Sequence, residues 1–507
     1  MGLDTLKFPR IQAIGLDKLW ALVVVAGIFI FVNTQPIRPH DFWWHITIGR
    51  EIINTGVIPS ADIYSFTMLG APYPSYQAFW LADIFLFCVF QAGGPAWVVF
   101  MQSLVVTSAY GLLLWLCWRV SNNWRIAALA VLFAATLGIN NWNVRPQTIS
   151  YLLGVIFLVA IYAYRYKSKY AWLAVFPLGM LVWVNSHGSF VIGLVLIGIW
   201  LADEIWQLGK AWVQKTPIEL RAGFWGALIA LLTALLACLA NPRGLGIINY
   251  VATLLADPAV QNLVPEWAAP RLDDLFGAIF LGALLLSAIL MALPERRPNF
   301  FQLLTWLVFG LLSLSTMRGV AWFGIVMAPV LADHLVGLRL PERKDRKPQK
   351  SRPFLVYTNL LILVILGIGM VVSLPWFKDS LAFPRLKEGL ISSETPVMAT
   401  EFMLAEELPG DLFNELGFGS YLIWAAQPRK VFIDPRIELY PLEIWGDYIT
   451  ISNASPGWEA KLEDYGIQTL MLSPANQPVL IETLSTAPGW RLAYEDLASV
   501  IFVIRPE

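Results

Sequence analysis

The segment from His40 to His45 brings one carboxylate, two imidazoles and two indoles together, directly after the first long apolar run of the chain. Ionisable groups at a membrane surface are costly and are usually retained for function. In this setting Asp41 could accept a proton from an acceptor hydroxyl as a general base, with His45 beside it. The segment therefore suggests chemistry at the membrane face on a lipid-borne substrate.

Each of these residues also has a structural interpretation. Asp41 precedes a predicted helix and could cap it, since Asp is favoured at that position. Trp43 and Trp44 could anchor the chain in the membrane interface, and His45 could bind a backbone carbonyl. Further along, Asp62 follows Pro59-Ser60-Ala61 and fits a turn. Asp83 is expected on the wet face of a surface helix, and His187 could be satisfied at the helix break Asn185-Ser186-His187-Gly188.

Three arginines form a second group of candidates. Arg145, Arg243 and Arg318 each adjoin a proline or glycine at the end of a predicted helix. A guanidinium group offers a rigid fork that matches phosphate oxygens, and it could stabilise a phosphate leaving group. Structural pairing with Glu266 or Asp41 is the alternative. We expect the three arginines to meet His187 and Glu266 at one lipid-phosphate site near Asp41.

These residues must be positioned by a membrane protein. Of the 507 residues, 57% are hydrophobic and 14% are charged, and the mean hydropathy is +0.61, which excludes an ordinary soluble enzyme. The three cysteines show no metal-type spacing, and no P-loop, dinucleotide or zinc motif is present. About eleven apolar runs are long enough to span a bilayer: 19–34, 95–118, 124–141, 147–164, 170–186, 188–206, 223–240, 275–293, 299–316, 319–338 and 354–375.

The run Tyr76–Gln91 is ambiguous, because Asp83 interrupts it and Gly93-Gly94 ends it. If it lies along the membrane surface, Lys and Arg concentrate in every second loop, with a strong cluster between Arg339 and Arg352. This is the bias of cytoplasmic loops. We therefore predict a cytoplasmic N-terminus in the inner or plasma membrane. The opposite, outer side then holds Asp41, His45, Asp62, Arg145, His187, Arg243, Glu266 and Arg318.

The composition changes near Lys378, after which strand-like and helix-like runs alternate. We predict a membrane domain over residues 1–376, with a first outer loop at 35–94, and a small extracytoplasmic α/β domain over residues 377–507. The basic, proline-bearing stretch Pro341–Pro353 is expected to be a mobile link. The expected strands are Lys430–Ile433, Thr469–Ser473, Arg491–Tyr494 and Val500–Ile504, and the expected helices are Ser420–Ala426 and Trp458–Tyr465.

At these residues the chain resembles the polyprenyl-phosphate-dependent glycosyltransferases of the GT-C superfamily. The architecture is similar to that of protein mannosyltransferases and aminoarabinose transferases. A group of bacterial glycosyltransferase-like membrane proteins is similar over nearly the whole chain. The segments that carry this likeness are Asp41-Phe42-Trp43-Trp44-His45, Gly56-Val57-Ile58-Pro59, Asp62-Ile63-Tyr64-Ser65, Arg145-Pro146-Gln147, Asn185-Ser186-His187-Gly188, Asn241-Pro242-Arg243-Gly244 and Phe432-Ile433-Asp434-Pro435-Arg436.

The resemblance implies that Asp41 is the catalytic base and that Asp62 is a second acid, for a divalent metal or for the acceptor. The Asp-Glu pair common in the superfamily is absent, because Phe42 follows Asp41. The implied reaction moves a sugar from a polyprenyl-phosphate donor to a glycan, lipid or protein acceptor, with no nucleic acid involved. An envelope-polysaccharide polymerase or ligase is a second hypothesis, and a non-catalytic subunit of a membrane complex is a third. An apolar cavity above Asp41, open to the bilayer, would favour an enzyme. A filled site, with Asp41 salt-bridged to an arginine, would favour the structural role.

Overall fold

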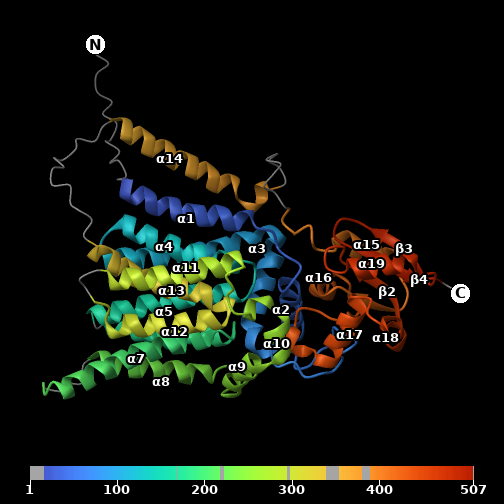
Figure 1. The fold of residues 1–507 in the computed structure, drawn as a ribbon, viewed down its shortest axis with the longest axis horizontal. Coiled ribbons are helices and arrows are strands. Elements are labelled where there is room, and N and C mark those ends of the chain that lie inside the picture. Colours follow the sequence, from blue (N-terminus) through green and yellow to red (C-terminus); the bar gives the residue numbers. More distant parts are fainter. Residues whose placement is uncertain are drawn as a thin grey trace, which may run out of the picture.

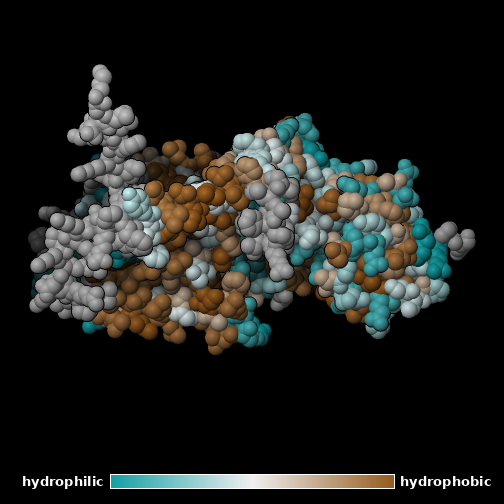
Figure 2. All heavy atoms as spheres, turned by 90° about the horizontal axis from the view of Figure 1, so that it is seen from above, coloured by the Kyte–Doolittle hydropathy of each residue, from teal (hydrophilic) through white to brown (hydrophobic). Residues whose placement is uncertain are grey.

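The computed structural model describes residues 16–167, 169–216, 222–293, 297–338, 353–378 and 389–505. Apolar helices lie side by side in a bundle, and a small mixed domain caps one end of it (Figure 1). Hydrophobic residues cover the bundle, whereas hydrophilic ones dominate the cap (Figure 2). Within the described residues, seven helices are long and apolar enough to cross a membrane. The protein is therefore a multi-pass membrane protein.

A helix lies at each of the predicted spans, although several are shorter than a full span. The bundle helices are α1 (Leu16–Thr34), α3 (Tyr76–Ser121), α4 (Trp124–Gly138), α5 (Gln147–Lys167), α6 (Val175–Val184), α7 (Phe190–Val213), α8 (Ala222–Cys238), α11 (Leu275–Ala292), α12 (Phe300–Ser315), α13 (Met317–Gly337) and α14 (Pro353–Val372). Helix α13 forms the centre of the bundle and contacts α3, α4, α11 and α12. The link predicted at Pro341–Pro353 falls outside the described residues except for Pro353, and so does the basic cluster 339–352.

Helix α3 bends at Gly93–Gly94, where the end of a surface helix was predicted. Its backbone leaves the helical conformation at Gly93 and Gly94, and Pro95 starts the second part. Gly94 has φ +64° and ψ −157°, a conformation that is essentially restricted to glycine. The part before the kink packs against α2 (Phe42–Thr55). Both run across the capped end of the bundle (Figure 1).

Short helices lie at both ends of the bundle. The loop after α4 holds η1 (Ile139–Asn141), and η2 (Tyr170–Ala174) precedes α6 at the other end. Between α8 and α11 lie three short elements that border the site described below. They are α9 (Gly246–Ala256), α10 (Pro258–Leu263) and η3 (Pro265–Trp267).

The cap contains a four-stranded sheet of order β1-β2-β4-β3, in which β1 and β2 are parallel and the other pairs are antiparallel. Its elements are η4 (Pro375–Phe377), which leads towards it, and α15 (Val397–Ala405), β1 (Asp411–Asn414), α16 (Leu416–Ala425), η5 (Ile437–Leu439), α17 (Leu442–Ser452), α18 (Trp458–Asp464), β2 (Ile467–Leu472), α19 (Pro478–Thr486), β3 (Trp490–Glu495) and β4 (Val500–Ile504). The predicted α/β class is confirmed, as are both predicted helices and three of the expected strands.

The strand predicted at Lys430–Ile433 is wrong, and β1 was not predicted. The side chain of Asn414, at the end of β1, accepts from the amide of Phe432 and donates to the carbonyl of Ile433. Val431 forms a single bridge with Ser65 of the first outer loop. This apolar run therefore joins the cap to the membrane domain instead of entering the sheet.

Candidate active site

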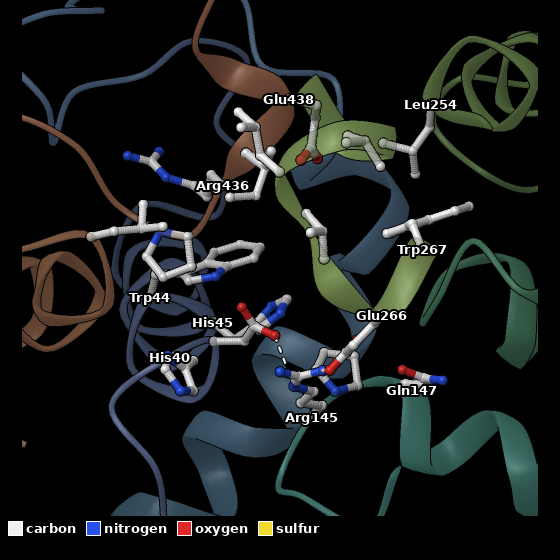
Figure 3. A pocket seen from close by; sticks show the side chains of 18 of the residues that line it. His40, Trp44, His45, Arg145, Gln147, Leu254, Glu266, Trp267, Arg436 and Glu438 are labelled. Carbon is white, nitrogen blue, oxygen red and sulfur yellow. Dashed lines mark hydrogen bonds and ion pairs between the residues drawn. The ribbon is translucent and has the colours of Figure 1, made fainter. Parts of the chain in front are cut away.

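A cavity of about 480 Å³ lies where the first outer loop, the segment around η3 and the cap meet. Figure 3 shows side chains from all three regions pointing into it. Its polar lining consists of His40, Asp41, His45, Arg145, Gln147, His187, Glu266, Arg318, Glu415, Arg436 and Glu438. Trp44, Tyr73, Phe79 and Trp267 add aromatic faces. Segments that are far apart in the sequence therefore share one site.

Asp41 occupies the N-cap position of α2, but its side chain accepts no capping hydrogen bond. Its Oδ2 atom lies 2.9 Å from Nε of Arg145. About a fifth to a quarter of each side chain remains exposed. The carboxylate thus faces the cavity and is held by a single arginine.

Arg145 also holds Glu266, and Glu266 holds Arg318. Arg145 Nη1 donates to Glu266 Oε1 at 2.6 Å, and Arg318 Nε donates to Oε2 at 3.1 Å. Burial raises the pKa of Glu266, but the two arginines outweigh this and bring it down to about 2. We call Asp41, Arg145, Glu266 and Arg318 the cavity cluster. Its two positive and two negative charges balance.

The cavity cluster is positioned from two sides of the bundle. Gln102 on α3 donates to the carbonyls of Trp142 and Asn143, which fixes the loop that carries Arg145. On the other side, the Thr316 hydroxyl donates to the backbone carbonyl of Glu266 at 3.0 Å. Thr316 also caps α13, whose first turn carries Arg318. Glu266 and Arg318 are therefore placed by the same helix start.

His45 is bound by a carboxylate rather than by a backbone carbonyl. Its Nδ1 lies 2.6 Å from Asp83 Oδ1, and both side chains are buried. Gly49 makes this contact feasible, because a Cβ at that position would lie 2.1 Å from the Asp83 carbonyl oxygen. Burial, followed by the charges of His187 and Arg145, holds the pKa of His45 well below its usual 6.5. Asp83 therefore does not face water, as its sequence position suggested, and it orients a neutral imidazole at the cavity.

His187 combines the two interpretations left open for it. Its Nδ1 accepts from the amide of Ser189 at 3.0 Å, which satisfies the helix break. The ring nevertheless lines the cavity. Burial, with Arg318 and Arg145 nearby, lowers its pKa to about 3. Because Nδ1 is an acceptor, the proton of the neutral ring resides on Nε2.

Arg243 does not join the other two arginines. Its Nη1 donates to Gln77 Oε1 at 3.4 Å, and its guanidinium lies 5.7 Å from the centre of the Tyr250 ring. It is absent from the cavity lining. The structure thus brings together Arg145 and Arg318 and leaves Arg243 in a separate loop contact.

Asp62 also lies away from the cavity. Its Oδ2 accepts from the amide and hydroxyl of Ser65, as expected for a turn. Its Oδ1 accepts from Arg436 Nη1 at 2.5 Å, and Arg436 also holds Asp434 through Nη2 at 2.6 Å. All three side chains are fully buried. We call Asp62, Asp434 and Arg436 the buried cluster, and it joins the first outer loop to the cap.

The two neighbouring tryptophans are buried instead of exposed at the membrane interface. Trp43 packs edge-on against Tyr421 of the cap at 5.0 Å. Trp44 stacks on His45 at 3.6 Å and lines the cavity. The interpretation as interface anchors is therefore wrong, because α2 is enclosed between α3 and the cap.

Most of the cavity residues that the cap contributes were not predicted from the sequence. Glu438 accepts from Tyr73 and Ser75, at 2.8 and 2.6 Å, across the domain boundary. Glu415 caps α16 through the amide of Phe418, and burial raises its pKa. Only the segment ending in Pro435-Arg436 had been singled out by its resemblance, since Glu415 and Glu438 stand in no motif of their own.

A divalent metal finds no ready set of ligands among the described residues, where no group of three or more His, Cys, Asp or Glu side chains comes together. Both acids of the cavity cluster are already neutralised by arginines. The residues present do not fit a metal, and we derive no step through one.

No family model and no curated protein matches the sequence. Solved structures do match its fold. The oligosaccharyltransferase AglB from Archaeoglobus fulgidus, in complex with an inhibitory peptide and a dolichol-phosphate, has a TM-score of 0.55 at 13% identity over 96% of this chain and 74% of its own. The arabinofuranosyltransferase AftD from Mycobacteria has a TM-score of 0.56 at 13% identity over 98% of this chain and 40% of its own. The chain shares the fold of these two transferases. At this identity the likeness is one of fold, and the predicted fold class is confirmed.

Proposed function

We propose that the protein is a GT-C glycosyltransferase that moves a sugar from a polyprenyl-phosphate donor to an acceptor on the outer side of the membrane. The observation that carries the proposal is the cavity cluster: two carboxylates and two arginines meet in a cavity at the end of a membrane bundle. The matching folds of AglB, whose structure contains a dolichol-phosphate, and of AftD support it.

The donor phosphate binds Arg145 and Arg318, whose forks suit its oxygens. The cluster is neutral without a ligand, so an incoming phosphodiester makes one carboxylate redundant. Glu266 is held by both arginines, whereas Asp41 is held by one. Asp41 is therefore the group that the phosphate displaces. The ion pair between Asp41 and Arg145 is then the resting state of the site.

The displaced Asp41 is the general base of the transfer. The acceptor hydroxyl oxygen attacks the anomeric carbon of the sugar, and its proton passes to Asp41. The bond between that carbon and the phosphate oxygen breaks, and its electron pair leaves with the polyprenyl phosphate. Arg145 and Arg318 stabilise the charge that develops on this leaving group.

Two neutral imidazoles complete the site. His187 presents a fixed Nε2–H donor, and His45 is oriented by Asp83. Both rings can bind sugar or phosphate oxygens without adding charge to a balanced cluster. The aromatic faces of Trp44 and Trp267 suit the apolar face of a sugar ring. Asp62 and Arg243 lie outside the cavity lining, and we assign them to the architecture of the loops rather than to the reaction.

The outer location follows from the charge bias of the loops and has its own test. In a variant lacking Cys88, which is exposed, new cysteines at Ser60 and Ser485 should react with an impermeant maleimide in intact cells. A cysteine at Gln214, at the other end of the bundle, should react only after lysis. Labelling of Gln214 alone would place the cavity in the cytoplasm.

The decisive experiment replaces Asp41 in cells that lack the wild-type gene copy. The envelope glycans that deletion removes should return with the wild-type protein and remain absent with Asp41→Asn, because general-base catalysis contributes about 10²–10⁴-fold. Asp273→Asn is the matched control, since Asp273 is also paired with an arginine but is exposed. Normal glycans with Asp41→Asn would favour the non-catalytic subunit, which the resting ion pair alone would also fit. A changed chain length, with single-sugar transfer intact, would favour the polymerase or ligase.

A further inference from the structure

A second cavity, of about 780 Å³, lies at the end of the bundle opposite the cap, between α3, α5, η2, α12 and α13. Helix α5 links the two cavities, because Arg145 stands just before its start and Arg165 lies in its last turn. Its 21 residues rise about 30 Å, which is the thickness of a bilayer's hydrocarbon core. The second cavity therefore lies at the other membrane–water interface.

The lining of this cavity is rich in cations and aromatic rings. Arg119, Arg165 and Lys169 line it, and Asp333 is its one acid within the described part of the chain. Arg165 Nη1 pairs with Asp203 at 2.7 Å, and Asp333 accepts from Gln302 at 2.9 Å. Among the described residues no carboxylate pairs with Arg119 or Lys169. These two exposed cations therefore have no counter-charge within the part of the chain that the structure describes.

The aromatic residues place this cavity at headgroup level. Trp115, Trp118 and Trp172 border it, and tryptophan is enriched where a membrane protein meets the lipid headgroups. The Arg119 guanidinium lies 5.8 Å from the centre of the Trp118 ring and 6.0 Å from that of Trp115. These contacts hold the cation against the aromatic lining of the cavity.

We propose that this cavity binds the phosphodiester headgroup of an anionic membrane lipid. Basic pockets between membrane helices are suited to such headgroups, and the volume is that of an ordinary ligand site. The alternative is that Arg119 and Arg165 only offset the negative ends of α3 and α5. In that role the two arginines need no ligand, and the protein would bind anionic and zwitterionic lipids equally well.

The test uses the purified full-length protein in detergent with equal amounts of phosphatidylglycerol and phosphatidylcholine, and native mass spectrometry to count bound lipid. Phosphatidylglycerol should be retained in preference. Arg119→Gln and Lys169→Gln should each weaken its binding about fivefold, and the double variant about thirtyfold, as expected for one headgroup charge contact per cation. Arg125→Gln is the matched control, because Arg125 lies on α4 outside this lining and pairs with Asp17.

A second arm separates a lipid from a free anion. Inorganic phosphate at millimolar concentration should leave the bound phosphatidylglycerol in place. Displacement by phosphate, equal retention of the two lipids, or unchanged retention in the double variant would each overturn the proposal. Arg119→Lys keeps the charge and should restore most of the binding, which separates a lost contact from a misfolded protein.

Discussion

Two arginine–carboxylate clusters join distant segments of this molecule, and they differ in access to solvent. The side chains of the cavity cluster are 20–33% exposed, whereas those of the buried cluster are 0% exposed. Under the proposed function a phosphate reaches Arg145 and exchanges with a carboxylate. Arg436 borders the same cavity, but its side chain is fully buried and turned to Asp62 and Asp434. The same kinds of side chain then take part in chemistry in one place and in architecture in the other.

The largest effect should come from breaking the buried cluster. Arg436→Leu leaves Asp62 and Asp434 buried without a counter-charge, and loss of one partner of a buried ion pair costs about 3–5 kcal/mol. The thermal unfolding temperature of the purified protein should fall sharply, and glycan transfer should be lost together with the folded protein. A stable but inactive Arg436→Leu protein would instead assign the buried cluster to catalysis and erase the contrast.

Arg145→Gln tests the other side of the comparison. Loss of one preorganised donor to a developing charge costs about 10²–10³-fold in rate, while a partly exposed ion pair contributes only about 0–1 kcal/mol to stability. Transfer in isolated membranes should therefore fall steeply with little change in unfolding temperature. Arg271→Gln removes an exposed pair outside the cavity and should change neither quantity. Unfolding of Arg145→Gln would make the cavity cluster structural as well.

Asp83→Asn tests whether a fully buried acid can still act on the cavity through His45. The amide keeps the shape but weakens a buried hydrogen bond worth about 1.5 kcal/mol, so transfer should fall about tenfold. Asp83→Glu, which retains the carboxyl group but not the fit beside Gly49, should recover less than the wild-type rate. Full activity of Asp83→Asn at every pH would limit Asp83 to packing.

The smallest effect concerns pH. Burial lowers the pKa of His187 from 6.5 to about 3, so the unfolded chain binds a proton in this interval that the folded protein does not. The stability of the folded state therefore falls as the pH decreases from about 6.5 towards 3. His187→Gln should flatten this part of a plot of unfolding temperature against pH. An unchanged slope would mean that His187 titrates freely and is open to water.

The bundle could be predicted because membrane spans are long apolar runs whose signal is local. The break at Gly93–Gly94 could be predicted for the same reason, because two adjacent glycines interrupt a helix locally. Pairing of the arginines with Asp41 or Glu266 was one of the two alternatives left open, and Arg145 and Arg318 form these pairs. The partner of Asp62 could not be predicted, since Asp41 and Asp62 stand in the same loop and differ only in which distant arginine reaches them. The prediction of a strand at Lys430–Ile433 was wrong because the sequence of a buried apolar run does not show which segment it pairs with. Glu415 and Glu438 were missed because their place at the cavity exists only after the cap has docked.

The length of α5 has a further consequence. The helix fixes the distance between the two cavities at about the thickness of a bilayer's hydrocarbon core. The position of both cavities relative to the headgroups therefore depends on the thickness of the membrane. In a thinner membrane the two cavities stay level with the headgroups only if the bundle tilts or the bilayer thickens locally. The lipid composition of the host membrane, through its thickness, then decides how readily a lipid-borne donor reaches Arg145.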